Sequence, residues 1–137
     1  MSVEENKFLA TRFYEEILNG RDMDVADEIL DTQYIDHSAA ARGLESFKTY
    51  FAMITSVFPD IRVTIEDMLV EDQKVAVRLT VRGTQAGSFR GFPATGGQAI
   101  WSGMDIIHIA NGKLVERWSE RDFLHMLVQL GHVRYPQ

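Results

Sequence analysis

The spacing of the apolar residues changes near residue 60, and the change separates a helical part of the chain from a sheet-forming part. Before that point apolar residues recur at about one helical turn, which predicts three helices. The first lies between Ser2, which forms a capping-box pattern with Glu5, and Gly20. The second follows Asp22, a residue type that caps helices, and the third ends at Phe58.

Beyond residue 60 the apolar residues alternate with polar ones, which is the period of a strand with one buried face. Asn111-Gly112 is a strong signal for a tight hairpin between two such segments. A loop rich in glycine, residues 86–97, separates another pair. The pattern predicts strands over residues 61–69, 75–84, 98–110 and 113–119, and a last helix over 122–130.

Helices followed by a meander of long strands and one short C-terminal helix predict an α+β fold. The strands are expected to form a curved antiparallel sheet, wrapped into a cone by the N-terminal helices. A cone of this kind encloses an apolar pocket. The length predicts one domain over residues 1–137.

Composition narrows the classes of function. The chain carries a formal charge of -6 with scattered basic residues, which argues against nucleic acid as a partner. It lacks an apolar run long enough for a membrane span and lacks cysteine, so we expect a cytoplasmic protein without disulfides or thiolate chemistry. No metal-ligand spacing and no phosphate-binding glycine motif is present, so neither a metal nor another cofactor is expected.

Several short motifs occur in a characteristic order. They are Arg12-Phe13-Tyr14-Glu15-Glu16, Tyr34-Ile35-Asp36-His37, Phe58-Pro59-Asp60, Gly83-Thr84, Gly91-Phe92-Pro93-Ala94-Thr95-Gly96, Asn111-Gly112-Lys113-Leu114-Val115-Glu116 and the ending from Trp118 to Gly131. With these motifs the chain resembles the SnoaL-like polyketide cyclase family of the nuclear-transport-factor-2-like superfamily. The resemblance implies a cofactor-independent enzyme that closes a ring by intramolecular aldol condensation, with an aspartate, here Asp122, as acid and base.

Asp122 has two interpretations. An aldol closure needs one base to remove a proton from a carbon between carbonyls, and a carboxylate can serve. However, Asp122 directly precedes the last predicted helix, where an aspartate caps the free N–H groups. The helix end stabilises the carboxylate, whereas burial against Trp118 and Phe123 would raise its pKa. Asp122 can therefore act as a base near neutral pH only if burial outweighs the helix end.

His37 matches a histidine of the family's pocket and is the second candidate for proton transfer, with a surface histidine as the alternative. Trp118 is expected to bind substrate through its ring and its N–H group, or to pack in the core. The remaining candidates for the pocket wall are aromatic: Phe13, Phe51, Phe89, Phe92 and Trp101. The two in the glycine-rich loop, Phe89 and Phe92, would form a lid or anchor that loop.

Asp105 shares a predicted strand face with Trp101, and an aspartate among apolar neighbours suggests a functional role. A structural pairing across the sheet with Arg78 or Arg82, or exposure to solvent, explains it equally simply. Glu116 and Arg117 point to opposite faces of their strand, so only one of them enters the cone.

The sequence therefore predicts an enzyme that acts on an apolar, carbonyl-bearing small molecule. An isomerase or hydrolase on the same scaffold, a binder of apolar metabolites without catalysis, and a protein-interaction module are the alternatives. The polar alternation of Arg78, Thr80 and Arg82 suits a sheet face that is either solvated or covered by a second copy, and a homodimer through this face is expected.

Overall fold

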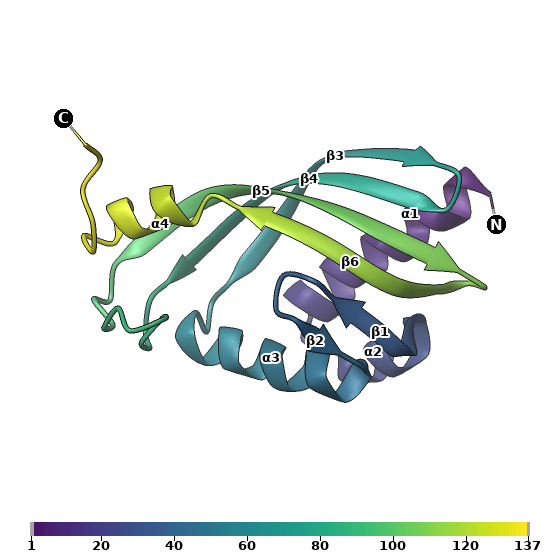
Figure 1. Ribbon diagram of the computed structural model, residues 1–137, viewed down its shortest axis with the longest axis horizontal. Helices are drawn as coiled ribbons and strands as arrows, with labels where there is room; N and C mark the ends of the chain where they lie inside the picture. Colours follow the sequence, from purple (N-terminus) through teal and green to yellow (C-terminus); the bar gives the residue numbers. More distant parts are fainter. Residues whose placement is uncertain (1, 137) are drawn as a thin grey trace.

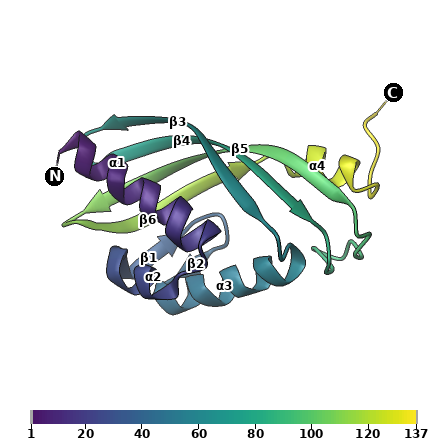
Figure 2. The same cartoon turned by 180° about the vertical axis from the view of Figure 1, so that it is seen from behind.

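One curved sheet carries the helices α1, α2 and α3 on the same face, and α4 extends from the end of the last strand, β6 (Figures 1 and 2). The computed structural model describes residues 2–136. The helical elements are α1 (Val3–Arg12), η1 (Phe13–Asn19), α2 (Met23–Ile29), α3 (Leu44–Val57) and α4 (Phe123–Gln129). The strands are β1 (Leu30–Asp36), β2 (Ala41–Arg42), β3 (Arg62–Glu71), β4 (Lys74–Thr84), β5 (Gln98–Ala110) and β6 (Lys113–Arg121).

The six strands follow the order β2-β1-β6-β5-β4-β3. The meander from β3 to β6 is antiparallel throughout, and the α+β class is confirmed. The expectation of a wholly antiparallel sheet is wrong at one place, because β1 pairs with β6 in parallel. A short extended segment after a helix gives no sequence signal for its pairing partner. This parallel contact brings the end of β1 next to the middle of β6.

The first helical segment changes its geometry halfway. α1 begins at the capping box between Ser2 and Glu5, as the sequence predicts. From Phe13 the backbone continues as a π-helix, a wider turn that is often found at functional sites. Phe13, Tyr14 and Ile17 are fully buried under the sheet, so this segment supplies much of the core.

α3 covers the end of the sheet opposite the chain's N-terminus (Figure 1). Phe47 and Phe51 lie one turn apart on its buried side and stack on each other, as expected for an amphipathic helix. The loop that joins β4 to β5 lies beside the end of α3, because the N–H groups of Ala86 and Gly87 both donate to the carbonyl of Val57. Among residues 2–136 no helix is long and apolar enough to cross a membrane.

Candidate active site

A cavity of about 370 Å³ lies between α3 and the concave face of the sheet. Its walls are mainly apolar, and the aromatic residues among them come from α3 and its C-cap, β5, the β4–β5 loop and the start of α4: Tyr50, Phe51, Phe58, Phe89, Trp101 and Phe123. Ser38, Arg117, Ser119 and Arg121 also line it, and we call these four residues the polar end of the cavity. An apolar pocket with a few convergent polar groups is the usual form of a small-molecule site.

The polar end exists because β6 contains an extra residue. Ile109 of β5 pairs with Leu114, but the preceding residue on β5, His108, pairs with Glu116. Val115 is therefore a bulge, and it shifts the alternation of every later residue on β6. Without the bulge, Glu116 and Trp118 would share the buried face of Leu114. With it, the strand turns the next set of side chains, starting at Arg117, toward the cavity.

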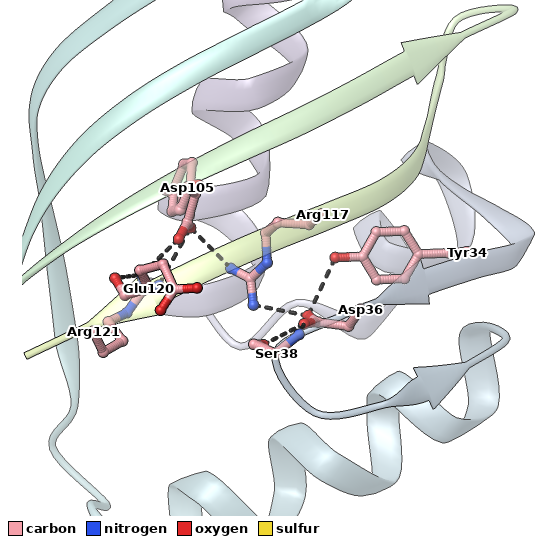
Figure 3. Close-up of polar contacts among 8 residues, drawn as sticks. Tyr34, Asp36, Ser38, Asp105, Arg117, Glu120 and Arg121 are labelled. Carbon is pink, nitrogen blue, oxygen red and sulfur yellow. Dashed lines mark hydrogen bonds and ion pairs between the residues drawn. The ribbon is translucent and has the colours of Figure 1, made fainter. Parts of the chain in front are cut away.

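Alternation along β6 did not decide whether Glu116 or Arg117 faces inward. In the structure Arg117 is buried, while Glu116 lies on the opposite, outer face. Its guanidinium lies between two buried carboxylates from neighbouring strands (Figure 3). Nη2 is 2.8 Å from Asp36 Oδ2 on β1, and Nη1 is 3.3 Å from Asp105 Oδ2 on β5. The face of the guanidinium also lies 4.8 Å from the ring centroid of Phe13.

Arg121 completes this cluster at the other side of Asp105. Its Nη1 and Nη2 atoms lie 2.5 and 3.2 Å from the two carboxylate oxygens, in a bidentate pair. Gly103, opposite Arg121 in the sheet, provides the space for the Arg121 side chain, because a Cβ at this position would lie 2.6 Å from Arg121 Cδ. Tyr14 donates a third contact to Asp105 Oδ2 at 2.6 Å. Two arginines and two aspartates thus form one network, in which three members are buried and Arg121 is partly exposed; we call it the quartet: Asp36, Asp105, Arg117 and Arg121.

The charges of the quartet are set by its own members. Burial raises the pKa of Asp105, but Arg117 and Arg121 outweigh burial and hold that pKa below its usual range. Burial lowers the pKa of Arg117, yet Asp36 and Tyr34 reverse the effect and keep it well above the ordinary value. Asp105 and Arg117 are therefore ionised although both are buried. For Tyr14, burial and the nearby Asp105 carboxylate keep the hydroxyl protonated by raising its pKa well above normal.

The quartet is oriented toward the cavity. Both arginines line the cavity, whereas neither Asp36 nor Asp105 does. In addition, Arg117 Nε and Ser119 Oγ are buried without a hydrogen-bond partner in the described part of the chain. The positive side of a neutral cluster therefore faces the enclosed space, and two unpaired donor groups add to it.

His37 lines the same cavity from the segment that follows β1, where its side chain is partly exposed. Its ring stacks on Trp118 with centroids 4.7 Å apart and planes inclined by 5°. Nε2 lies 2.9 Å from Glu116 Oε2, and the other oxygen of Glu116 lies 3.1 Å from His108 Nδ1. These two histidine contacts lower the pKa of Glu116, which is therefore an acceptor, so His37 Nε2 donates. In the neutral ring Nδ1 is then unprotonated and can accept a proton.

Asp122 does not line the cavity. It is exposed, and its Oδ1 accepts a hydrogen bond of 3.0 Å from the backbone N–H of His125, as an N-cap of α4. Phe123 turns into the cavity, but Trp118 lies on the outer face of the sheet. The burial that base chemistry at Asp122 requires is therefore not provided by these two residues.

The other predicted site residues divide into two groups. The cavity brings together Phe51, Phe89 and Trp101 with His37, as expected. It does not include the rest. Trp118 stacks on His37 from outside, Phe13 is enclosed in the core beneath Arg117, Phe92 packs on His132, and Asp105 is paired behind Arg117 and Arg121 instead of with Arg78 or Arg82.

Arg121 and Asp36 are not among the candidates that the sequence predicts, and the sequence leaves open whether Arg117 or Glu116 enters the cone. Asp36 is fully buried, although it also accepts from the N–H of Ser38 as a turn aspartate does. The available signal was the spacing of Arg117, Ser119 and Arg121 at every second residue, opposite a strand that carries Asp105 on an apolar face. No group of three or more His, Asp or Glu side chains in residues 2–136 is arranged to hold a metal ion.

Known proteins of the same kind share this architecture. A model of the SnoaL-like polyketide cyclase family matches residues 8–130. The chain belongs to this family. It is 27% identical over 129 residues to aklanonic acid methyl ester cyclase DnrD of Streptomyces peucetius, an alignment that covers 90% of this chain and 88% of that protein.

Two solved structures show the same fold along nearly the whole chain. TsrD from Streptomyces laurentii superimposes with a TM-score of 0.87 at 28% identity, and 97% of this chain and 99% of that chain are covered. IdmH from Streptomyces antibioticus gives 0.81 at 26% identity, with 92% and 98% covered. Membership confirms the expected class, a cyclase-like enzyme of a family that acts on small molecules.

Asp105→Asn is expected to destabilise the protein by about 3–5 kcal/mol at neutral pH, because it leaves Arg121 without its charge partner and buried Arg117 with Asp36 alone. The pKa of Asp105 is depressed in the folded state, so its contribution is present above the ordinary value of 3.8 and is lost as the pH falls through the lower folded value. The difference between wild type and variant should therefore narrow below pH 3.8. Urea denaturation at several pH values measures this difference in the free energy of unfolding.

The matched control is Asp67→Asn, which removes an aspartate whose pairing with Arg78 is exposed. Its expected cost is about 0–1 kcal/mol. Equal losses for Asp105→Asn and Asp67→Asn would contradict the central role of the quartet.

Substitutions of Asp122 separate capping from catalysis. Asn caps a helix as well as Asp does, so Asp122→Asn should keep both stability and turnover. Asp122→Ala removes the cap and should cost about 1 kcal/mol in thermal or chemical denaturation, again with turnover retained per folded molecule. A loss of turnover in Asp122→Asn at unchanged stability would instead identify Asp122 as the base.

Proposed function

We propose that the protein is a cofactor-independent enzyme that promotes an intramolecular aldol ring closure in an apolar substrate with neighbouring carbonyl groups. The observation that carries the proposal is the orientation of the quartet, whose guanidinium groups line an aromatic cavity while its carboxylates do not. Family membership supports a cyclase, and the cavity supports a small apolar substrate. The substrate of DnrD is a property of that protein, and the proposal for this chain names only the reaction class.

The chemical demand of the reaction explains why the orientation matters. Removal of a proton from a carbon between carbonyls places negative charge on oxygen in the enolate. Fixed positive groups in a site with little water stabilise such charge without reorganising. Arg117 and Arg121 are held in place by Asp36 and Asp105, so their positions do not depend on the substrate.

The proton acceptor in this proposal is His37. It lines the cavity, its Nε2–H is directed to the Glu116 carboxylate, and Nδ1 is the free basic nitrogen. Stacking on Trp118 fixes the plane of the ring. A base held by a carboxylate and by packing has the arrangement that proton transfer requires. After the new carbon–carbon bond forms, the same imidazolium returns the proton to the alkoxide, so the step consumes no other reactant.

Binding without catalysis is the second candidate, because an aromatic cavity alone is sufficient to hold an apolar metabolite. Mass spectrometry of the protein under native conditions separates the two. An unchanged bound molecule that does not turn over favours the binder, whereas turnover favours the enzyme. An isomerase or hydrolase that uses the same base would differ in the product formed.

His37→Gln is expected to lower kcat for ring closure of a linear poly-β-carbonyl substrate by about 10²–10⁴-fold, the usual contribution of a general base. The product is followed by liquid chromatography with mass detection. The matched control is His108→Gln, since His108 contacts the same Glu116 but does not line the cavity. Full turnover in His37→Gln would remove His37 from the mechanism, and no ring closure with the wild type would overturn the proposed function.

We further infer a homodimer through the outer face of the sheet. That face exposes a row of apolar side chains from β5, and Met104 has 59% of its surface exposed. Ile100 lies four residues before Met104 and Ile106 two residues after it, and the cations Arg78 and Arg82 of β4 lie beside the row. A patch with apolar and charged groups of this kind suits a two-fold contact with a second copy.

Met104→Asp is expected to shift the protein from dimer to monomer, because it places a charge at the centre of the apolar row. Sedimentation velocity at several protein concentrations measures the change. Phe8→Asp is the control, since Phe8 is exposed on α1, away from the sheet face. A wild-type protein that sediments as a monomer at all concentrations would exclude the dimer.

A further inference from the structure

Among residues 2–136, Arg90 is the one cavity-lining arginine outside the quartet. It lies on the loop between β4 and β5, is exposed, and lines the cavity, so it stands where the cavity opens to solvent. Within the described residues its guanidinium has neither an ion-pair partner nor a hydrogen bond. By contrast, Arg117 and Arg121 are each engaged by a buried carboxylate. Arg90 therefore carries an uncompensated positive charge at the opening.

The loop holds Arg90 in one place. Its guanidinium lies 5.1 Å from the ring centroid of Phe89 and 5.1 Å from that of Phe123, two residues of the cavity wall. The backbone on either side is closed by reciprocal hydrogen bonds of 2.9 and 2.8 Å between Phe89 and Phe92. Contacts with two aromatic faces fix the cation while leaving its N–H edge for a ligand.

The backbone at this position is also unfavourable. Arg90 adopts a left-handed conformation with φ 47°, next to Gly91 with φ 86°. A residue with a long side chain costs about 1 kcal/mol or more in this region, whereas a glycine would adopt it freely. Such strain at the edge of a cavity suggests that the side chain has a role that glycine cannot fill.

The charged side chains at the opening indicate the sign of the charge on the ligand. The whole chain has a formal charge of -6, yet three arginines line the cavity. Glu120 is the sole acidic side chain among the lining residues in the described range, and it makes no ion pair with Arg90 within 4 Å. After Asp36 and Asp105 have neutralised Arg117 and Arg121, the charged side chains left on the lining are Glu120 and Arg90, and of these two only Arg90 can bind an anion.

We propose that Arg90 is a specificity-determining residue that binds an ionised carboxylate on the substrate, so that the enzyme prefers a free acid to its ester. A planar guanidinium with free N–H groups matches the two oxygens of a carboxylate. The proposal rests on the proposed function for the location of the site. It adds that the apolar, carbonyl-bearing part lies among the aromatic walls, while the carboxylate stays at the opening near Arg90.

Binding of inert aromatic probes tests this proposal without turnover. Isothermal titration calorimetry compares 2-naphthoate with methyl 2-naphthoate, which share the apolar ring and differ in the charge. Wild type should bind the acid about tenfold more tightly or better, the usual strength of a charge-assisted contact. Arg90→Gln should remove the preference and leave the affinity for the ester unchanged.

Arg42→Gln is the matched control, because it removes an equal charge from an exposed residue of β2 that does not line the cavity. It should keep the preference for the acid. Equal affinity of the wild type for acid and ester would overturn the role of Arg90, and so would an equal loss in Arg42→Gln. These outcomes leave the proposed function intact, since that is decided by ring closure and by His37→Gln.

A kinetic comparison gives an independent readout. With a poly-β-carbonyl acid as substrate, Arg90→Gln should raise KM about tenfold and leave kcat nearly unchanged, since Arg90 contacts a group that does not react. With the corresponding methyl ester, neither parameter should change. A fall in kcat for both substrates would contradict a role confined to recognition.

Discussion

The site depends on the ion pairs that the guanidinium of Arg117 forms with two buried carboxylates. Asp36 comes from the first strand, Asp105 from the fifth and Arg117 from the sixth, so one side chain joins three strands of the sheet. Tyr14 of the π-helical segment contacts Asp105, which ties the helical layer to the same point. The ring of Phe13 closes the cluster from below.

A buried ion pair contributes little net stability compared with apolar packing, because both charges lose their hydration. Its effect here lies in position and direction. Each charged side chain lacks its partner unless the other strands are in place. The ion pairs therefore all form in only one arrangement of the three strands. That arrangement turns the arginines to the cavity and the carboxylates away from it. The same constraint that selects the fold therefore creates the field that acts on a bound molecule.

The elements were predictable from the sequence, while the site was predictable only in part. Periodicity and turn residues gave the four helical regions and the long strands nearly to their ends, because these depend on local rules. The parallel pairing of β1 with β6 depends on a contact between distant segments, which local spacing does not report. Aromatic residues of the cavity such as Trp101 were found because they follow the buried face of a regular strand.

The errors at the site have one main source. The bulge at Val115 reverses which side chains of β6 face inward, and no residue type marks it in advance. An unbroken alternation from Leu114 would place Trp118 inside and Arg117 outside, the reverse of what the structure shows. At Asp122 the local capping rule predicted the observed geometry, and the distant resemblance had favoured another role.

The distance along the chain between Asp36 and Arg117 bears on how the protein assembles. Eighty-one positions separate the two partners, so this ion pair closes one of the longest loops available to the chain. During synthesis Asp36 emerges well before β6, and its carboxylate stays hydrated until the last strand arrives. Insertion of β6 beside β1 is thus the event that dehydrates the carboxylate. We infer that the cavity appears late in folding and all at once, instead of maturing gradually around a preformed N-terminal half.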